Sequence, residues 1–439
     1  MKTLQVITLG CSKNTVDTEH LLYQIRNSFE IVPEGEERPV DYLLINTCGF
    51  IGDAKQQSID TILSQVARKN AGDIGNLFVF GCLSQRYFSE MPSLIPEVDA
   101  WFGARDLDPL IKSLGCTPDH SSDHMRILTG LSRPYAYLKI SEGCDRRCSY
   151  CAIPLIRGHH RSVPMEILVK EAEALSAKGI KELVLIAQDT TFYGLDLYHK
   201  RCLAELLRKL SSVDGIEWIR IHYSYPADFP EDVLDEMASN PKVCRYMDIP
   251  LQHISDKVLD NMRRHVDGAW TRALIQKMRS RVPGLVLRTT MIVGHPGEGK
   301  KEFEQLLDFV REARFERLGA FVYSEEEGTY GAENFKDSVS LKTKQSRLDT
   351  LMSEQSGISF AYNSSRVGTE VKVLIDDYVD GTFICRSEFE SPEVDGEILV
   401  KYSPEVFDGI EPYSLVGEFI TVRITGAFDY DLTAELLNI

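Results

Sequence analysis

Short apolar runs that alternate with amphipathic stretches make up the first part of the chain. Helical spacing of apolar positions covers Val16–Phe29 and Ala54–Lys69. The apolar runs around them are typical of strands, and each ends in a cysteine: Leu4–Cys11, Tyr42–Cys48 and Leu77–Cys82. Because strands that alternate with helices form parallel sheets, we expect residues 1–120 to be a small parallel α/β domain.

A longer strand–helix alternation runs from Pro134 to about Ser324. The candidate helices include Met165–Lys178, Pro230–Ser239 and Lys301–Arg314. The candidate strands are Tyr135–Ile140, Glu182–Ala187, Trp218–His222, Tyr246–Ile249, Val286–Val293 and Ala320–Tyr323. Six such units are three-quarters of an eight-fold barrel, and the carboxyl mouth of such barrels carries the chemistry. We therefore expect residues 130–362 to form a partial (βα)6 barrel, with Ser338–Tyr362 as a polar, helix-compatible linker at its end.

The pattern changes again near the C-terminus, where β-branched residues alternate with polar ones, as in TEVKVLID and GEFITVRIT. Residues 363–433 are therefore expected to form five short antiparallel strands in a small β-barrel. From Arg366 to Ile439 there are 5 Lys and Arg against 16 Asp and Glu, so this part carries −11 of the net charge of −17. Such a barrel suits a basic protein partner better than a phosphate backbone, although a merely solubilising surface is the alternative.

Composition narrows the class of protein. The chain is 43% hydrophobic and 26% charged, which is ordinary for a globular protein, and no apolar run approaches the ~20 residues of a membrane helix. We expect a cytoplasmic protein without a membrane partner. Ten cysteines in such a compartment favour metal or catalytic roles over disulfides.

Three cysteines follow the first strand of the predicted barrel in a C-x3-C-x2-C array, Cys144, Cys148 and Cys151. Three thiolates on a four-iron cluster leave one iron open to a small molecule. A zinc site with His159 or His160 as fourth ligand is the alternative, but the paired CxxC spacing of structural zinc is absent. The spacing favours an iron–sulfur cluster.

The strand-end cysteines of the first domain, Cys11, Cys48 and Cys82, form a second candidate set. They lie 37 and 34 residues apart, about one βαβ unit each, so all three are expected at the carboxyl edge of one parallel sheet. Each adjoins a glycine, which allows close approach of the backbone. Buried packing is the alternative for a single cysteine, but three at equivalent positions predict a second cluster.

These motifs resemble a known family. The cysteine array with Tyr150 before its third cysteine resembles the signature loop of radical S-adenosylmethionine enzymes. The segments LGCSKNTVDTE, INTCGFI and FGCLSQRY resemble the N-terminal domain of the methylthiotransferases, and the C-terminal barrel resembles their TRAM domain. The first segment is similar to the LGCPKNxVDSE form of the ribosomal-protein branch rather than the GCQMN form of the tRNA branch, with Ser12 where proline is usual.

The resemblance implies two [4Fe-4S] clusters and S-adenosylmethionine. Tyr150 would pack near the adenine, and Gln188 and Asp189, at the end of the second barrel strand, would contact S-adenosylmethionine unless they only cap a helix. The implied reaction adds a methylthio group to the β-carbon of an aspartate in the twelfth protein of the small ribosomal subunit. No general base is expected because the first bond broken is homolytic.

The resemblance also implies partners. It indicates a flavodoxin- or ferredoxin-type electron donor, and the acidic barrel predicts no stable nucleic-acid binding. Two alternatives stay open: the same chemistry on an adenine of tRNA, which predicts a basic last domain, and a non-catalytic iron–sulfur factor that binds RNA or ribosomes.

Overall fold

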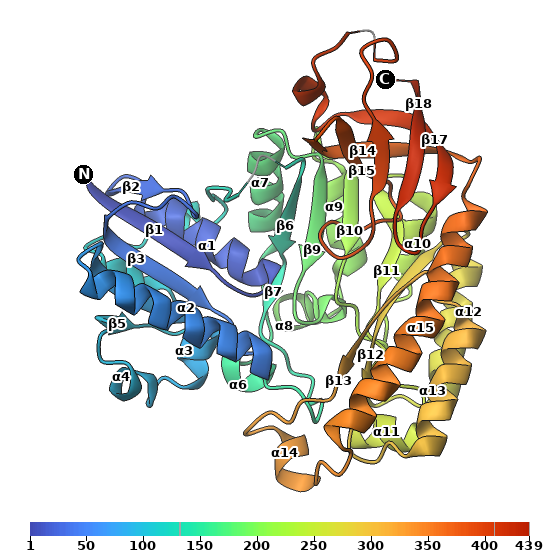
Figure 1. The fold of residues 1–439 in the computed structure, drawn as a ribbon, viewed down its shortest axis with the longest axis horizontal. Coiled ribbons are helices and arrows are strands. Elements are labelled where there is room, and N and C mark those ends of the chain that lie inside the picture. The colour runs from blue at the N-terminus through green and yellow to red at the C-terminus, as the bar shows by residue number, and fades with distance from the viewer. Residues whose placement is uncertain (131–132, 408, 439) are drawn as a thin grey trace.

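A five-stranded parallel sheet in the order β2-β1-β3-β4-β5 forms the first part of the molecule (Figure 1). The structure is a computed structural model that describes residues 1–130, 133–407 and 409–438. The strands are β1 (Lys2–Thr8), β2 (Phe29–Val32), β3 (Val40–Thr47), β4 (Ile74–Gly81) and β5 (Ala100–Trp101). The helices are α1 (Ser12–Ile25), α2 (Gly52–Asn70), α3 (Cys82–Arg86), α4 (Met91–Leu94) and α5 (Asp108–Ser113).

Helix α1 differs from the sequence prediction. It begins at Ser12, directly after Cys11, and ends at Ile25, because Phe29 belongs to β2, a strand that the apolar pattern did not reveal. The early start is stabilised by Asn14, whose side-chain amide donates to Leu9 O at 2.7 Å and to Thr47 O at 3.2 Å. The first turn of α1 is therefore fixed to the ends of both β1 and β3.

Six parallel strands in the order β13-β12-β11-β10-β9-β6 form the central sheet, which confirms the predicted partial barrel. They are β6 (Tyr135–Lys139), β9 (Glu182–Ile186), β10 (Trp218–Ile221), β11 (Val243–Asp248), β12 (Val286–Val293) and β13 (Arg317–Val322). The larger helices of this part are α7 (Met165–Ser176), α9 (Leu203–Ser211), α10 (Asp232–Ser239), α12 (Gly268–Arg281) and α13 (Lys300–Ala313). Their apolar faces and one face of the sheet share a single large core.

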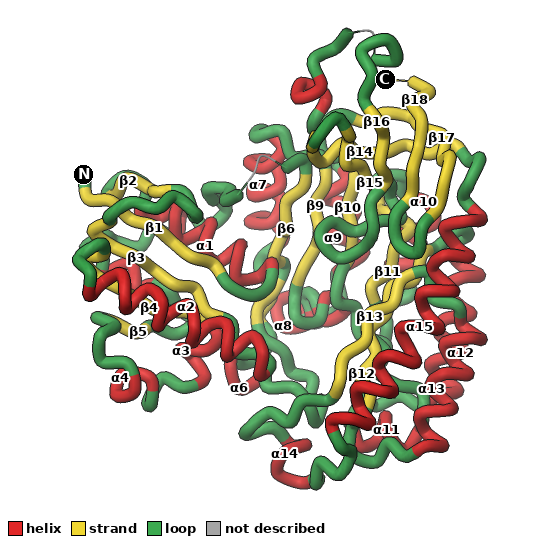
Figure 2. Tube along the Cα trace, in the orientation of Figure 1, coloured by secondary structure: helices red, strands yellow, loops and turns green. Residues whose placement is uncertain are grey.

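The polar stretch before the C-terminal barrel is one long helix, α15 (Leu341–Ser365), of 25 residues. Its buried Leu351 and Ile358 join the central core. Figure 2 shows α15 in red beside α12 and α13, on one side of β12 and β13. The stretch is therefore part of the central unit. None of the helices in the described ranges is long and apolar enough to cross a membrane.

The C-terminal strands close into a small barrel in the order β14-β15-β16-β18-β17, as predicted. They are β14 (Glu370–Val379), β15 (Thr382–Arg386), β16 (Ile398–Lys401), β17 (Phe419–Ala427) and β18 (Leu432–Asn438). The expectation of purely antiparallel pairing needs one correction, because β16 and β18 pair in parallel. The chain crosses from β16 to β17 before it returns as β18, so β18 closes the barrel beside β16 in the same direction.

The segment between β15 and β16 attaches this barrel to the inner face of the central sheet. Glu390 accepts from Arg317 of β13 at 3.0 Å, and Asp395 accepts from the Tyr246 hydroxyl of β11 at 2.6 Å. Ser391 Oγ lies 2.7 Å from His222 Nε2, directly after β10. Polar side chains of three central strands are thus satisfied by one loop, which fills that half of the inner face.

Candidate functional site

The three cysteines of the first sheet lie where its strands end. Cys48 directly follows β3, Cys82 follows β4 and begins α3, and Cys11 stands at the start of α1. Gly10 has φ +94°, and a Cβ at this residue would lie 2.7 Å from Cys48 Cβ and 3.0 Å from its Sγ. The glycine therefore allows the Cys11 loop to approach the next strand end at a distance that no other residue permits.

The other three cysteines lie in the loop after β6. This loop is closed by the short pair β7 (Ser141–Glu142) and β8 (Arg161–Ser162) and ends in α6 (Ile153–Arg157). Cys144 N donates to Gly158 O at 3.0 Å, and Ser149 N donates to Met262 O at 3.0 Å. The backbone around the cysteines is thus fixed at the carboxyl edge of the central sheet, where parallel barrels carry their sites.

Burial disfavours the thiolate form of four of the six cysteines. Burial raises the pKa of Cys82 to about 11 and the pKa of Cys144 to about 12, and it also raises the pKa of Cys48 and Cys151. Thiolates at these positions need a positively charged partner that the chain supplies only in part. An iron cluster provides such charge, so the donor sets fit it.

Each histidine of the zinc alternative has a hydrogen-bond partner outside the cysteine sets. In the described part of the chain, no three His, Cys, Asp or Glu side chains lie close enough to coordinate one metal ion. Zinc thiolates lie about 4 Å apart because each Zn–S bond is about 2.3 Å long. In a four-iron cluster each thiolate binds a different iron, which spreads the ligands further. His159 Nδ1 lies 2.7 Å from Asp145, and His160 Nε2 lies 3.0 Å from Ser162 Oγ.

Arg157, the last residue of α6, connects the two cysteine sets. Its guanidinium, 2% exposed, donates to Cys82 Sγ at 3.3 Å and to Asn14 Oδ1 at 2.6 Å. It also donates to Asp17 of α1 at 2.8 Å and to Glu142 of β7 at 3.1 Å. One side chain from the Cys144 loop therefore contacts a cysteine of the other set and both carboxylates beside it.

Glu142 is the charged centre of this junction. Burial alone raises its pKa, but Lys139 and Arg157 outweigh burial and lower the pKa of Glu142 to about 2. Lys139 Nζ lies 2.8 Å from Glu142 Oε2 and also pairs with Asp17. The charges of two cations and two carboxylates thus cancel at the junction of the two α/β units. The partners within this network could not be paired from the sequence, because they lie in separate segments without motif spacing.

The predicted S-adenosylmethionine contacts have defined partners. Gln188 donates to Glu142 Oε1 at 2.7 Å. Asp189 accepts from Thr191 N at 2.9 Å, which caps the short helix Thr190–Phe192, and from Arg146 Nε at 2.9 Å. The capping alternative therefore describes part of what Asp189 does. Its role and that of Gln188 toward S-adenosylmethionine stay predictions.

Tyr150 lies in a buried aromatic and cationic cluster beside Cys148. Arg264 donates to the Tyr150 hydroxyl at 3.3 Å and to Cys148 Sγ at 3.4 Å. The Tyr225 hydroxyl lies 3.7 Å from the same sulfur. Arg264 carries no signal in the sequence, because it enters from the loop after the helix Asp256–Asn261. The cluster supplies one positive charge beside the Cys144 set.

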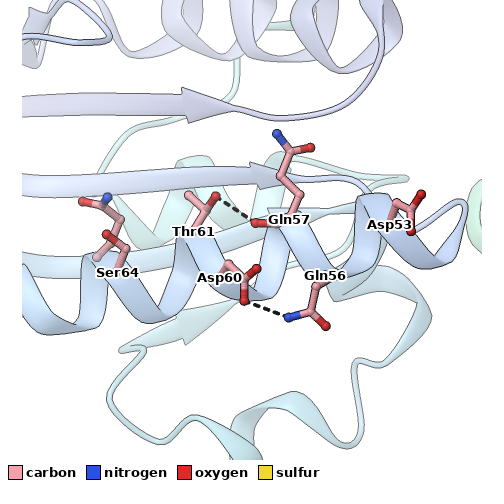
Figure 3. A pocket seen from close by; sticks show the side chains of 7 residues that line it. Asp53, Gln56, Gln57, Asp60, Thr61 and Ser64 are labelled. Carbon is pink, nitrogen blue, oxygen red and sulfur yellow. Dashed lines mark hydrogen bonds between the residues drawn. The ribbon is translucent and has the colours of Figure 1, made fainter.

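The hollow in Figure 3 is a different feature. It measures about 620 Å³ and is lined by seven polar residues of α2: Asp53, Gln56, Gln57, Asp60, Thr61, Ser64 and Gln65. Gln56 donates to Asp60 at 2.8 Å along the helix. All its residues come from one helix and none adjoins a cysteine, so it is a solvated helix surface.

Comparison with known proteins places these features in context. Residues 138–310 match the Radical SAM superfamily, residues 3–103 match the uncharacterized protein family UPF0004, and residues 367–437 match the TRAM domain. The ribosomal protein uS12 methylthiotransferase RimO of Bacteroides thetaiotaomicron is 49% identical over 438 residues, 100% of this chain and 99% of that protein. The protein of the same name from Phocaeicola vulgatus is 48% identical, with 99% of each chain covered.

A solved structure shares the fold. The radical S-adenosylmethionine methyltransferase TsrM from Kitasatospora setae, which has cobalamin and a [4Fe-4S] cluster bound, superposes with a TM-score of 0.57. The identity is 14%, and the match covers 76% of this chain and 77% of that chain. At this identity the likeness concerns architecture alone.

Proposed function

Because this chain belongs to the family of ribosomal protein uS12 methylthiotransferases RimO, we propose that it attaches a methylthio group to the β-carbon of an aspartyl residue of uS12. The chain is a radical S-adenosylmethionine enzyme with an iron–sulfur cluster. We further propose residues 1–120, 130–362 and 363–433 as its domains.

Two [4Fe-4S] clusters are part of the proposal. Cys144, Cys148 and Cys151 would hold the cluster that binds S-adenosylmethionine, with Tyr150 near the adenine and Gln188 and Asp189 as further contacts. Cys11, Cys48 and Cys82 would hold the second cluster. When bound, these groups would supply the radical that removes hydrogen and the sulfur that is transferred.

The observation that carries the proposal is Arg157. It follows the Cys144 array by six residues, yet it donates to Cys82 Sγ of the other set. Two cluster sites that served separate functions would need no shared, buried guanidinium. The protein's own task is then to keep both sets at one site and to exclude water from it.

The charge of the last domain supports a protein substrate. The net charge of −11 over residues 366–439 opposes binding of a nucleic-acid backbone and favours a basic ribosomal protein. We propose no stable nucleic-acid complex, and a flavodoxin- or ferredoxin-type electron donor. Methylthiolation of tRNA is the competing function, and no feature of the described residues favours it.

Mass analysis of the anaerobic reaction tests the proposal. Iron-loaded protein, reductant and S-adenosylmethionine are incubated with a uS12 peptide that contains the target aspartate, beside a tRNA stem-loop. A methylthio mass gain on the peptide is expected. A methylthio mass gain on the RNA alone would overturn the proposed function. A reaction that forms no 5′-deoxyadenosine would overturn it as well.

A further inference from the structure

Lys13 is a buried cation in the first turn of α1, two residues after Cys11. It is 8% exposed, and its Nζ lies 3.4 Å from the centroid of the Tyr223 ring. Tyr223 follows β10 at the carboxyl edge of the central sheet and has φ +58°. Its backbone N–H donates to Asp248 at 2.9 Å, which fixes the backbone of Tyr223 at this position.

Lys13 differs from the other cations of this region because it has no carboxylate. Within residues 1–130, 133–407 and 409–438, no acidic side chain forms an ion pair with it, and the aromatic face is its only charge-stabilising contact. The neighbouring pairs are complete: Lys139 with Asp17 and Glu142, Arg157 with the same two, Arg146 with Asp189, and Arg288 with Asp248. An ammonium that is held over an aromatic ring and pairs with no carboxylate remains available to bind an anionic ligand.

The position of Lys13 limits which anion it can bind. It extends from the N-terminal unit, beside the Cys11 set, toward the strand ends of the central unit. The Cys144 set has its own cations, because Arg264 contacts Cys148 and Arg146 lies in its loop. A carboxylate that binds Lys13 therefore belongs to a molecule that lies between the two units.

We propose that Lys13 binds the side-chain carboxylate of the substrate aspartate. The proposal rests on the proposed function, in which the reacting β-carbon is directly bonded to that carboxyl group. A hydrogen bond of about 2.8 Å between the ammonium and the carboxylate positions the β-carbon, which is bonded to the carboxyl carbon. The same bond selects aspartate over asparagine, because the asparagine amide is uncharged. Lys13 thereby acts as a substrate-binding and specificity-determining residue.

Peptide binding by the anaerobic, iron-loaded protein with S-adenosylmethionine tests this. The probes are a fluorescent uS12 peptide with the target aspartate and the same peptide with asparagine. Wild type is expected to prefer the aspartyl peptide by about ten- to a hundredfold in Kd, and K13M to lose that preference. K13R, which keeps the charge, is expected to retain most of it.

K2M is the matched control. Lys2 lies 5.2 Å from the Tyr42 ring at the opposite end of β1, so this variant loses the same charge and a similar contact. K2M should bind both peptides with the Kd values of wild type. All samples are matched for iron content before the comparison. The inference is overturned if K13M keeps the preference for the aspartyl peptide or if K13R loses that preference as K13M does. It is also overturned if K13M weakens the binding of S-adenosylmethionine rather than that of the peptide. Wild type that binds neither peptide overturns the proposed function as well.

Discussion

Replacement of Arg157 by methionine tests whether the junction of the two α/β units depends on one buried charge. Methionine has a similar length but donates no hydrogen bond. In R157M, Asp17 and Glu142 would share Lys139 as their only cation, because the guanidinium contacts at 2.8 and 3.1 Å are lost. The junction changes from balanced to a net buried charge of about −1.

The size of the effect follows from this imbalance. Removal of one partner of a buried ion pair costs about 3–5 kcal/mol. For a unit of roughly 150–250 residues, each kcal/mol lowers Tm by about 2–4 °C. We therefore expect the iron-loaded R157M protein to melt about 6–20 °C below wild type in an anaerobic fluorescence melt. Its visible cluster absorbance should also change, because Cys82 loses a hydrogen-bond donor.

R105M is the matched control for this experiment. Arg105 also joins the two units, since it donates to Ile156 O at 2.8 Å and to Leu155 O at 2.6 Å, but it pairs with no carboxylate among the described residues. Its loss should cost about 1 kcal/mol. Melting of R157M within 2 °C of wild type, or equal to R105M, would refute the argument from charge balance.

Three further predictions concern the cysteine sets and the C-terminal barrel. C48A should reduce bound iron from about eight to about four atoms per chain, as measured by iron analysis. C116A should keep all of the iron, because Cys116 belongs to neither cysteine set and its Sγ contacts Leu114 O at 4.0 Å. G10A should lower iron content similarly, because its Cβ would collide with Cys48 at 2.7 Å in a backbone conformation of φ +94°. Burial raises the pKa of Glu390, but two buried arginines outweigh it and lower the pKa to about 2. Its stabilisation, about 3 kcal/mol, is therefore complete above about pH 4.5 and lost as pH falls toward 2. In urea titrations the stability difference between wild type and E390Q should shrink over that range, and a constant difference would contradict this assignment.

Much of the fold was predictable because its signals are local. Strand–helix alternation predicted both parallel sheets, and β-branched alternation predicted the barrel. The cysteine positions also carried information, because equal spacing in a βαβ repeat leads to one sheet edge. The strand β2 escaped prediction because its four residues, FEIV, are too short for a period to show. The parallel pairing of β18 depends on the path between strands, which no local pattern records.

The pairing within the charged network of the site could not be predicted for a different reason. Nothing in the segments that hold Arg157, Asp17 and Glu142 indicates that they pair, and only the docking of α1 against β6 and α6 brings them together. Lys13 is also ordinary in the helix start LGCSKN. Its significance arises from Tyr223, which lies 210 residues later in the chain. The role of Lys13 and Arg157 therefore depends on distant contacts that form only in the folded chain.

The incomplete central barrel explains why the three units depend on one another. A parallel sheet needs both faces covered, and helices cover only the outer one. On the inner face, Val16 of α1 packs against Val184 and Ile186 toward one end. Polar residues at the other end contact the loop between β15 and β16. Segments from both neighbouring units thus contact the inner face of the sheet, and the segment around α1 is the one that carries Cys11 and Lys13. Completion of the fold and assembly of the site are therefore the same structural event.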